Sequence, residues 1–296
     1  METESKQKRK GSEEDGKIRL TPMDPISQLS DHLIHKVLSF LETKYAARTS
    51  VLSKAWNRIW LTFPIININV HYNHYIQNNH LLESSQEEFL SLVDESLQRR
   101  FQENFSVSVF SMLISLPSLE LVAPHMDWWL GIALERNVQK MVLIFCTDAH
   151  RLYHVRVPHA VMSATSLNVL ELQNCTVDGN CNIKLPQLCM LTLRYVRLLD
   201  EKMLSDLSFN FPIIEDLVIR SSKGLNSDID IDVGLAAFIG LKVLKLQDAM
   251  ITDEKFQNLM SKLPCLEDLE LIWCGSLNRI RISSQKRPSE TEVGIL

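Results

Sequence analysis

The sequence predicts an α/β protein in which three short helices are followed by an elongated stack of parallel strands with helical or irregular connections. Two patterns support this prediction: a group of apolar residues at helical spacing near the N-terminus, and a register of leucines that recurs through the second half. With 45% hydrophobic and 23% charged residues, the composition is typical of globular proteins and excludes disorder throughout. The 296 residues allow one elongated domain or two compact ones.

The charge balance and the apolar runs exclude several classes of protein. There are 31 Lys and Arg against 36 Asp and Glu, a formal charge of −5, whereas a dedicated nucleic-acid binder usually carries a basic surplus. No apolar run approaches the roughly 20 residues that span a bilayer. Residues 1–15 are charged where a secretory signal would be apolar, so we expect the six cysteines to remain thiols in a reducing compartment. We predict no nucleic-acid partner, no membrane association, and residence in the nucleus, the cytoplasm or both.

Residues 1–22 are expected to form a disordered tail, because they contain almost nothing apolar to bury. The basic run at 6–10 is compatible with a nuclear-import signal, but an ordinary solvated tail is the favoured interpretation. The sequence leaves these two interpretations open.

Residues 23–62 show helical spacing. A first helix begins near Ser30, a plausible N-cap, and a second begins near Thr43. Ser53 is expected to cap a third helix. One apolar stripe on the first helix comprises Leu33, Ile34, Val37, Leu38 and Leu41, and Trp56, Ile59 and Trp60 share a face of the third. Because so short a segment buries little surface, its apolar stripe should dock against another protein.

Residues 63–136 are interpreted as a linker and the start of the strand stack, and 61–105 are the hardest part to interpret. Between Phe89 and Phe101 the apolar residues follow helical spacing, and Arg99 with Arg100 suits a helix C-terminus by complementing its dipole. Trp128 and Trp129 precede further apolar residues on a second expected helix, where a core role is favoured over ligand stacking.

Residues 137–284 carry an internal repeat of the form Leu-x-x-Leu-x-Leu-x-x-Cys. Its first positions are 29, 21, 26, 27 and 25 residues apart, within the range of leucine-rich repeats. The Leu-x-Leu core is a short strand whose leucines point inward, so stacking the strands makes a parallel sheet. Segments 201–209 and 253–263 are predicted to be helical connections. The copies begin at Val138 (weaker), Leu167, Leu188, Ile214, Leu241 and Leu266.

Other constellations are better explained by structure than by chemistry. Cys146, Cys175 and Cys274 share one repeat position, and no C-x-x-C pair is present, so a structural role is favoured over zinc. His71, His74 and His80 lie in a polar segment without a nearby Cys or Asp pair, so we predict no metal there. No phosphate loop or ordered Ser/His/Asp set is visible. We predict no enzyme, no catalytic residue and no cofactor, although dispersed catalytic residues remain an alternative.

The N-terminal segment resembles the F-box motif in its plant form. The resemblance rests on residues 24–27, 29–41 and 49–54 and on Trp56 and Trp60. It departs where Ser30 and Glu42 replace prolines and Ala55 replaces an arginine, and none of these changes removes a large apolar residue. Together with the repeats, the chain is similar to the plant F-box/leucine-rich-repeat family over most of residues 23–282.

That resemblance implies a substrate-recognition adaptor of a Skp-cullin-F-box ubiquitin ligase. The F-box would bind a Skp-family adaptor and, through it, cullin, while the repeats would bind an unknown target. Target binding is expected at strand positions that face solvent between the leucines: Glu171, Thr192, Val218, Lys245 and Glu270. The expected adaptor-binding residues are Pro25, Ile26, Leu29, Leu33, Ile34, Val37, Leu38, Leu41, Val51, Leu52, Trp56 and Trp60.

The C-terminal end leaves the functional interpretation open. Leu277, Ile280 and Ile282 suggest one more strand, and residues 285–296 are expected to form a disordered polar tail. Alternatives to the ligase role are a repeat scaffold whose F-box-like helices only cap the stack, or a divergent, non-functional member of the family.

Overall fold

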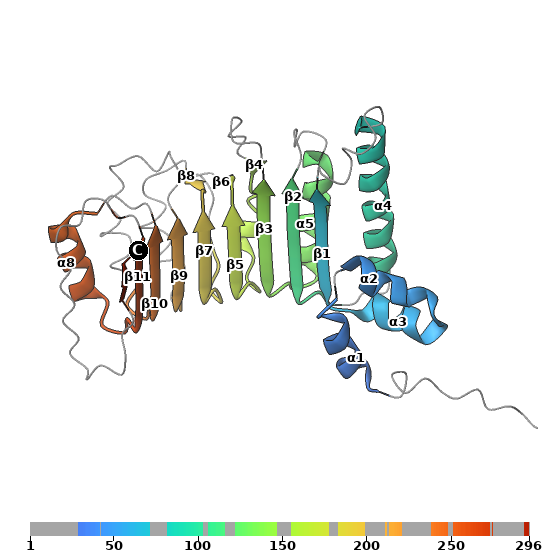
Figure 1. Cartoon of the computed structure of the whole chain (residues 1–296), viewed down its shortest axis with the longest axis horizontal. Helices are drawn as coiled ribbons and strands as arrows, with labels where there is room; N and C mark the ends of the chain where they lie inside the picture. The colour runs from blue at the N-terminus through green and yellow to red at the C-terminus, as the bar shows by residue number, and fades with distance from the viewer. Residues whose placement is uncertain are drawn as a thin grey trace, which may run out of the picture.

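The computed structural model describes residues 29–41, 43–71, 82–102, 106–115, 122–146, 155–177, 183–198, 211, 213–220, 238–247, 251–272, 274 and 293–295. Within these ranges, the molecule is an elongated parallel sheet with a helical module at the end where the sheet begins (Figure 1). The tail at 1–22, the expected helix at 201–209 and the suggested strand around 277–282 lie outside the described residues.

The helical module consists of α1 (Asp31–Leu38), α2 (Thr43–Arg48), the 3-10 turn η2 (Thr49–Val51) and α3 (Lys54–Thr62). The three predicted helices are therefore confirmed. Ser53 caps α3 as predicted, accepting a hydrogen bond from the backbone N–H of Trp56 at 3.3 Å. Ser30 occupies the N-cap position of α1, but its side chain makes no capping hydrogen bond. The module has a core of its own, formed by Ile34, Leu38, Ala46, Trp56, Ile59, Trp60 and Phe63.

Among the described residues, nine parallel strands form one sheet, and each strand lies beside its predecessor in the order β1-β2-β3-β5-β7-β9-β10-β11-β12. The strands predicted from the leucine register are confirmed. Leucines of successive repeats align across the sheet, so that Leu170 faces Leu191 and Leu191 faces Leu217. The strands are β1 (Ile65–His71), β2 (Val109–Ser115), β3 (Lys140–Cys146), β5 (Val169–Gln173), β7 (Met190–Arg194), β9 (Asp216–Arg220), β10 (Val243–Gln247), β11 (Asp268–Ile272) and β12 (Val293–Ile295).

The first two strands of the sheet lie within residues 63–136, which were expected to contain the start of the strand stack, but neither strand was located individually. Strand β1 follows α3 directly and pairs with β2 over seven residues, from Ile65 with Val109 to His71 with Ser115. Both strands alternate buried and more exposed residues, with Ile66, Ile68, Phe110 and Met112 in the core. This alternation is the sequence signal that could have found them. It was missed because neither strand carries the leucine register.

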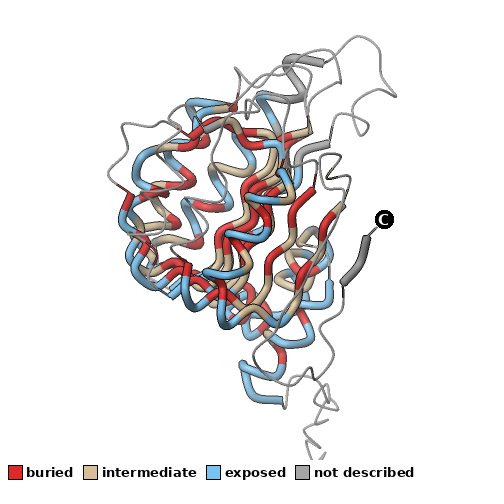
Figure 2. Tube along the Cα trace, turned by 90° about the vertical axis from the view of Figure 1, so that its left-hand side faces the viewer, coloured by how far each residue is buried: buried red, intermediate tan, exposed pale blue. Residues whose placement is uncertain are grey.

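One face of the sheet is the main core of the molecule. The inward-facing side chains of the strands share this core with α5 (Ala123–Glu135), η4 (Val161–Ser163) and α8 (Asp253–Lys262). These three elements contribute Trp129, Val161 and Phe256 respectively. Seen along the long axis, the buried segments run through the middle of the molecule and the exposed ones line its outside (Figure 2). The helices predicted around Trp128 and at 253–263 are confirmed as α5 and α8.

Two residues at the ends of strands bend the chain from the large sheet toward a small one. Asn174 and Tyr195 have φ of 54° each and lead from β5 and β7 into the short strands β6 (Cys175–Val177) and β8 (Arg197–Leu198). With β4 (Val155–Arg156), these make a three-stranded sheet. Asn tolerates this left-handed conformation well, whereas a bulky residue such as Tyr adopts it at a cost.

The helix expected between residues 89 and 101 is confirmed within α4 (Leu82–Gln102). It stands beside the helical module and the start of the sheet (Figure 1), and polar contacts hold it to α5. Asp94 accepts a hydrogen bond from Trp129 Nε1 at 2.7 Å and lies 2.8 Å from His125 Nδ1. Trp129 is thus a core residue, as expected, with its indole N–H satisfied.

At the C-terminal end, one expectation is corrected. Residues 285–296 were expected to form a disordered tail, whereas Val293–Ile295 forms β12, which pairs in parallel with β11. A three-residue strand gives little periodic signal, and it exists only because the edge of β11 offers unpaired backbone groups.

Candidate functional site

The helical module exposes an unusual number of large apolar side chains. Phe40 is 76% exposed, Val51 84% and Leu52 66%. Such side chains favour burial, and each contributes about 1.5 to 3 kcal/mol when fully buried. We call this set the apolar surface of the module: Leu29, Leu33, Val37, Phe40, Leu41, Tyr45, Val51 and Leu52.

The structure divides the residues expected to bind the adaptor into two groups. Six of them lie on the apolar surface: Leu29, Leu33, Val37, Leu41, Val51 and Leu52. Four are instead buried in the core of the module, and their expected surface role is corrected to a core role: Ile34, Leu38, Trp56 and Trp60. Pro25 and Ile26 lie outside the described residues. Phe40 and Tyr45 were not selected from the sequence, although Phe40 immediately precedes the selected Leu41.

The split within α1 has a simple geometric cause. The stripe is two residues wide, and α3 packs against only one edge of it, so Ile34 and Leu38 turn inward while Leu33 and Val37 remain about half exposed. Helical spacing places all four on neighbouring positions but does not say which edge meets the partner helix.

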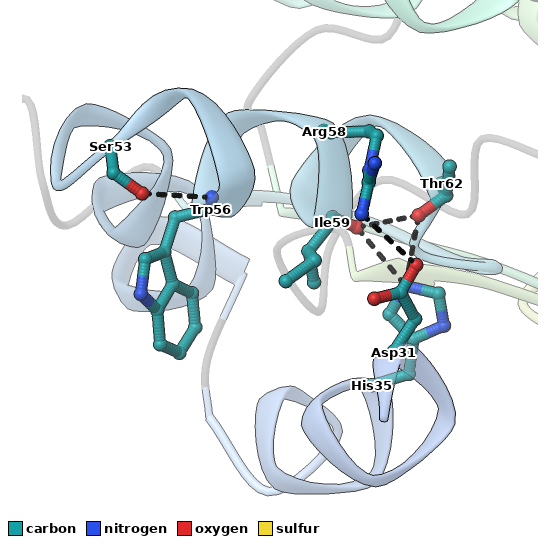
Figure 3. A network of polar contacts seen from close by, with 7 residues as sticks. All are labelled: Asp31, His35, Ser53, Trp56, Arg58, Ile59 and Thr62. Carbon is teal, nitrogen blue, oxygen red and sulfur yellow. Dashed lines mark hydrogen bonds and ion pairs between the residues drawn. The ribbon is translucent and has the colours of Figure 1, made fainter. Parts of the chain in front are cut away.

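Polar contacts orient α1 against α3 (Figure 3). His35 Nε2 lies 3.1 Å from the carbonyl oxygen of Ile59, to which it donates, and 3.1 Å from Thr62 Oγ1. Asp31 lies 3.7 Å from Arg58, a surface pair that contributes little by itself. The apolar surface is therefore presented on helices whose relative orientation is set by their own core and by this network.

A buried cation joins the module to the sheet. Arg100, near the end of α4, is 6% exposed and donates hydrogen bonds to the carbonyl oxygens of Phe63 and Ile65, between α3 and β1. Its guanidinium lies 4.7 Å from the ring centre of Trp60. Burial lowers the pKa of Arg100 to about 10. From the sequence, Arg100 was expected only to complement the helix dipole.

The five strand positions expected to bind the target lie in one row across the sheet. Glu171 faces Thr192, Thr192 faces Val218, and Lys245 lies between Val218 and Glu270. The register extends the row, which we call the outer row, to Asn67, Ser111 and Val142. One expectation is corrected: Thr192 is not open to solvent but 5% exposed, because neighbouring strands cover a small side chain more fully than a long one.

Charges along this face are mostly paired. Lys140 lies 2.9 Å from Glu171, and Lys245 lies 3.3 Å from Asp268 and 3.1 Å from Glu270. The hydrogen bond with Glu270 is the largest of the interactions that raise the pKa of Lys245. The described charges along the outer row are thus largely matched.

The described residues contain no group of three or more side chains that could hold a metal ion, and none of their helices is long and apolar enough to cross a membrane. His74 and His80 lie outside these residues. The described cysteines are free thiols. Cys175 is fully buried in β6, and burial raises its pKa to about 12, in keeping with the structural role expected for it.

Comparison with known proteins finds a recognised domain at the helical module. Residues 26–67 match the F-box domain. Three similar proteins come from Arabidopsis thaliana. An F-box/LRR-repeat protein is 31% identical over 68% of this chain and 53% of its own length. An F-box/FBD/LRR-repeat protein is 27% identical over 85% of this chain and 56% of its own length, and an FBD-associated F-box protein is 29% identical over 85% of this chain and 55% of its own length.

The chain spans about half the length of these relatives. The F-box match covers the helical module, and the printed names of the relatives fit the leucines that build the core of the sheet. The chain therefore belongs to the plant F-box/LRR-repeat family.

Proposed function

We propose that this chain is a substrate-recognition adaptor of a Skp-cullin-F-box ubiquitin ligase. In this proposal the apolar surface of the module binds a Skp-family adaptor and, through it, cullin, while the outer face of the sheet binds the target. The observation that carries the proposal is the apolar surface itself, which includes Phe40, Val51 and Leu52 at more than half exposure and lies within the F-box match.

We further infer that the strands form a leucine-rich-repeat solenoid. Support comes from the chain order of the parallel strands, from the alignment of the leucines in register and from the printed names of the relatives. A solenoid presents its strand face as one extended surface, which suits the recognition of a protein target.

The arrangement favours catalysis by proximity. A ligase that holds its target near a charged ubiquitin-conjugating enzyme raises the effective concentration of the reacting groups, so that this chain needs no catalytic residue of its own. Proximity is useful only if the target is held at a defined position. The buried Arg100 supports this requirement, since it fastens the end of α3 and the start of β1 to α4. Action in the nucleus, the cytoplasm or both is part of the proposal.

The test is co-purification of the full chain with Skp-family adaptors. Leu33→Ala/Val37→Ala removes two half-exposed side chains one helical turn apart on α1, and we expect adaptor affinity to fall by about tenfold or more with little change in the melting temperature. Leu92→Ala is the matched control, because Leu92 is 57% exposed but lies on α4, outside the module. Leu38→Ala is unsuitable, since Leu38 belongs to the core of the module.

Retained binding by the double variant contradicts the assigned surface. Failure of the wild-type chain to bind any Skp-family adaptor contradicts the ligase role and favours the alternative, a repeat scaffold that binds a partner without delivering it for ubiquitination.

A further inference from the structure

Two arginines stand side by side at the ends of neighbouring strands. Arg194 is the last residue of β7 and Arg220 the last of β9, and their Cα atoms are register partners. Neighbouring strands lie about 4.8 Å apart, so the two positively charged side chains extend from adjacent backbone positions. Gln173 on β5 and Gln247 on β10 flank them in the same register. We call these four residues the end row.

The end row lies on the same face of the sheet as the outer row. Arg194 follows Thr192 by two residues, and Arg220 follows Val218 by two, and side chains two apart on a strand point to the same side. Burial agrees with this direction, because Leu193 and Ile219, which intervene, are buried in the core, whereas Arg194 and Arg220 are partly exposed.

Neither arginine has an acidic partner among the described residues. On this face, the described lysines Lys140 and Lys245 both have one. Glu171, on the strand beside β7, is bound to Lys140. Asp216 lies four residues before Arg220 on β9, about 13 Å away along the strand. The two arginines are therefore exceptions on a surface of otherwise matched cations.

Arg194 also leaves a donor unused. Its Nε is buried and has no hydrogen-bond partner, although a guanidinium is always charged and carries five N–H donors. Buried polar atoms are seldom left unpaired, and a lone one in a native fold calls for a ligand or a functional reason. Adjacent like charges add a further cost that an external anion would remove.

The backbone holds both arginines in place. The carbonyl oxygen of Arg194 accepts a hydrogen bond from the N–H of Asn174, and that of Arg220 accepts one from the N–H of Tyr195, each at 3.0 Å. These bonds continue the sheet ladder past the last strand residues. Because the backbone at both positions is fixed, only the two side chains remain to be ordered on binding.

We propose that Arg194 and Arg220 bind the carboxylates of an acidic, Asp- or Glu-containing segment of the target protein. The inference rests on the proposed function, since it names the chemistry of the target. A guanidinium pairs with a carboxylate through two parallel hydrogen bonds, and two carboxylates would neutralise the pair. Carboxylates already satisfy the other cations of this face, which favours the same chemistry from outside. Gln173, which is partly exposed, offers further amide hydrogen bonds beside the pair.

The probe is a short fluorescein-labelled peptide of alternating Glu and Gly, titrated with the full chain by fluorescence anisotropy. We expect the Glu peptide to bind, salt to weaken the binding, and a peptide with Gln in place of Glu not to bind. Arg194→Gln/Arg220→Gln should weaken binding by about tenfold or more. Lys140→Gln/Lys242→Gln is the matched control: Lys140, at the start of β3, lies 2.9 Å from Glu171, and Lys242, just before β10, lies 2.8 Å from Glu215. Removing these two paired charges should weaken binding by only about twofold.

Folding controls separate recognition from stability. Arg194→Gln/Arg220→Gln should melt no lower than wild type, because it relieves the repulsion between two cations. Arg194→Lys/Arg220→Lys keeps both charges but loses the forked geometry, and its affinity should fall between those of wild type and the Gln variant. The Lys variant carries the test if the Gln variant folds poorly.

Three outcomes overturn the proposal: no binding of the Glu peptide to wild type, an equal loss in the two Gln double variants, or binding only of a peptide with phosphoserine in place of Glu. Co-purification with a Skp-family adaptor, measured on the same proteins, tells this failure apart from failure of the proposed function. A chain that binds the adaptor but not the Glu peptide refutes only the carboxylate site. A chain that binds the peptide but no adaptor refutes only the ligase role.

Discussion

Replacing Arg100 by Met tests whether one buried cation holds the F-box module against the sheet. Arg100 touches both sides of the junction: it stacks on Trp60 of α3 and donates to the carbonyl oxygens of Phe63 and Ile65. Methionine has a comparable reach and fills the space, but it donates no hydrogen bond. The change therefore removes the polar connection while retaining most of the packing.

The magnitude follows from opposing terms. Two buried carbonyl groups lose a charged donor, at about 1 to 3 kcal/mol each, and Trp60 loses a cation–π contact of about 2 kcal/mol. Against this, burial lowers the pKa of Arg100 well below its ordinary value, to about 10, so removing the buried charge recovers about 3 kcal/mol. We expect a net loss of about 3 kcal/mol, located at the junction.

Native-state hydrogen exchange is the assay, because it resolves where stability is lost. Amides of α3 and β1 should exchange about a hundredfold faster in Arg100→Met, which corresponds to about 3 kcal/mol, while those of β7 and β9 change little. Arg99→Met is the matched control, since the adjacent side chain is 76% exposed and has only a surface pair with Glu95.

Two results would refute this reasoning. One is an Arg100→Met variant whose exchange is no faster than that of Arg99→Met, which would mean that packing alone holds the junction. The other is an equal acceleration along the whole sheet, which would mean that the module and the sheet open only together.

Two further predictions concern single side chains. Burial raises the pKa of Cys175 to about 12, so this thiol should stay protonated and unreactive toward iodoacetamide at pH 8.5, whereas the exposed Cys265 should be alkylated in the folded protein. Mass spectrometry of the labelled peptides checks both expectations. Rapid labelling of Cys175 would contradict its burial. Tyr195→Asn should raise the free energy of unfolding by about 1 kcal/mol, because Asn adopts φ of 54° more readily than Tyr. A lower urea midpoint would instead show that the Tyr195 ring contributes more than its backbone strain costs.

The helices and the repeat strands were predictable because their signals are local. Leucines spaced as Leu-x-Leu define a strand and its buried side wherever they occur, so β5, β7, β9, β10 and β11 follow from the pattern alone. Amphipathic spacing likewise predicted α8 to within one residue at each end, and it located α4 and α5, although α4 begins seven residues before Phe89. Strands β1 and β2 show alternation without the leucine register, and β12 is too short for either signal.

The candidate surfaces were only partly predictable, since they depend on which residues meet across the fold. In α1 the stripe contains Leu33 and Leu38 alike, and only the packing of α3 separates the exposed residue from the buried one. Arg100 resembles any cation at a helix end until the fold brings Phe63 and Trp60 to it. Burial and partner choice are properties of contacts between distant segments, which local periodicity does not specify.

By itself, the sequence determined the class of this protein: an F-box-like helical segment followed by parallel strands with leucines turned inward, because periods of 3.6 and 2 residues dictate which side chains share a face. Only the tertiary structure decided which cations found partners. The strand register brings Lys245 to Asp268 and Glu270, and it also sets Arg194 beside Arg220, where no acidic partner lies among the described residues. The physical reason is that neighbouring strands come from different repeats, and the packing of the shared core settles how they align.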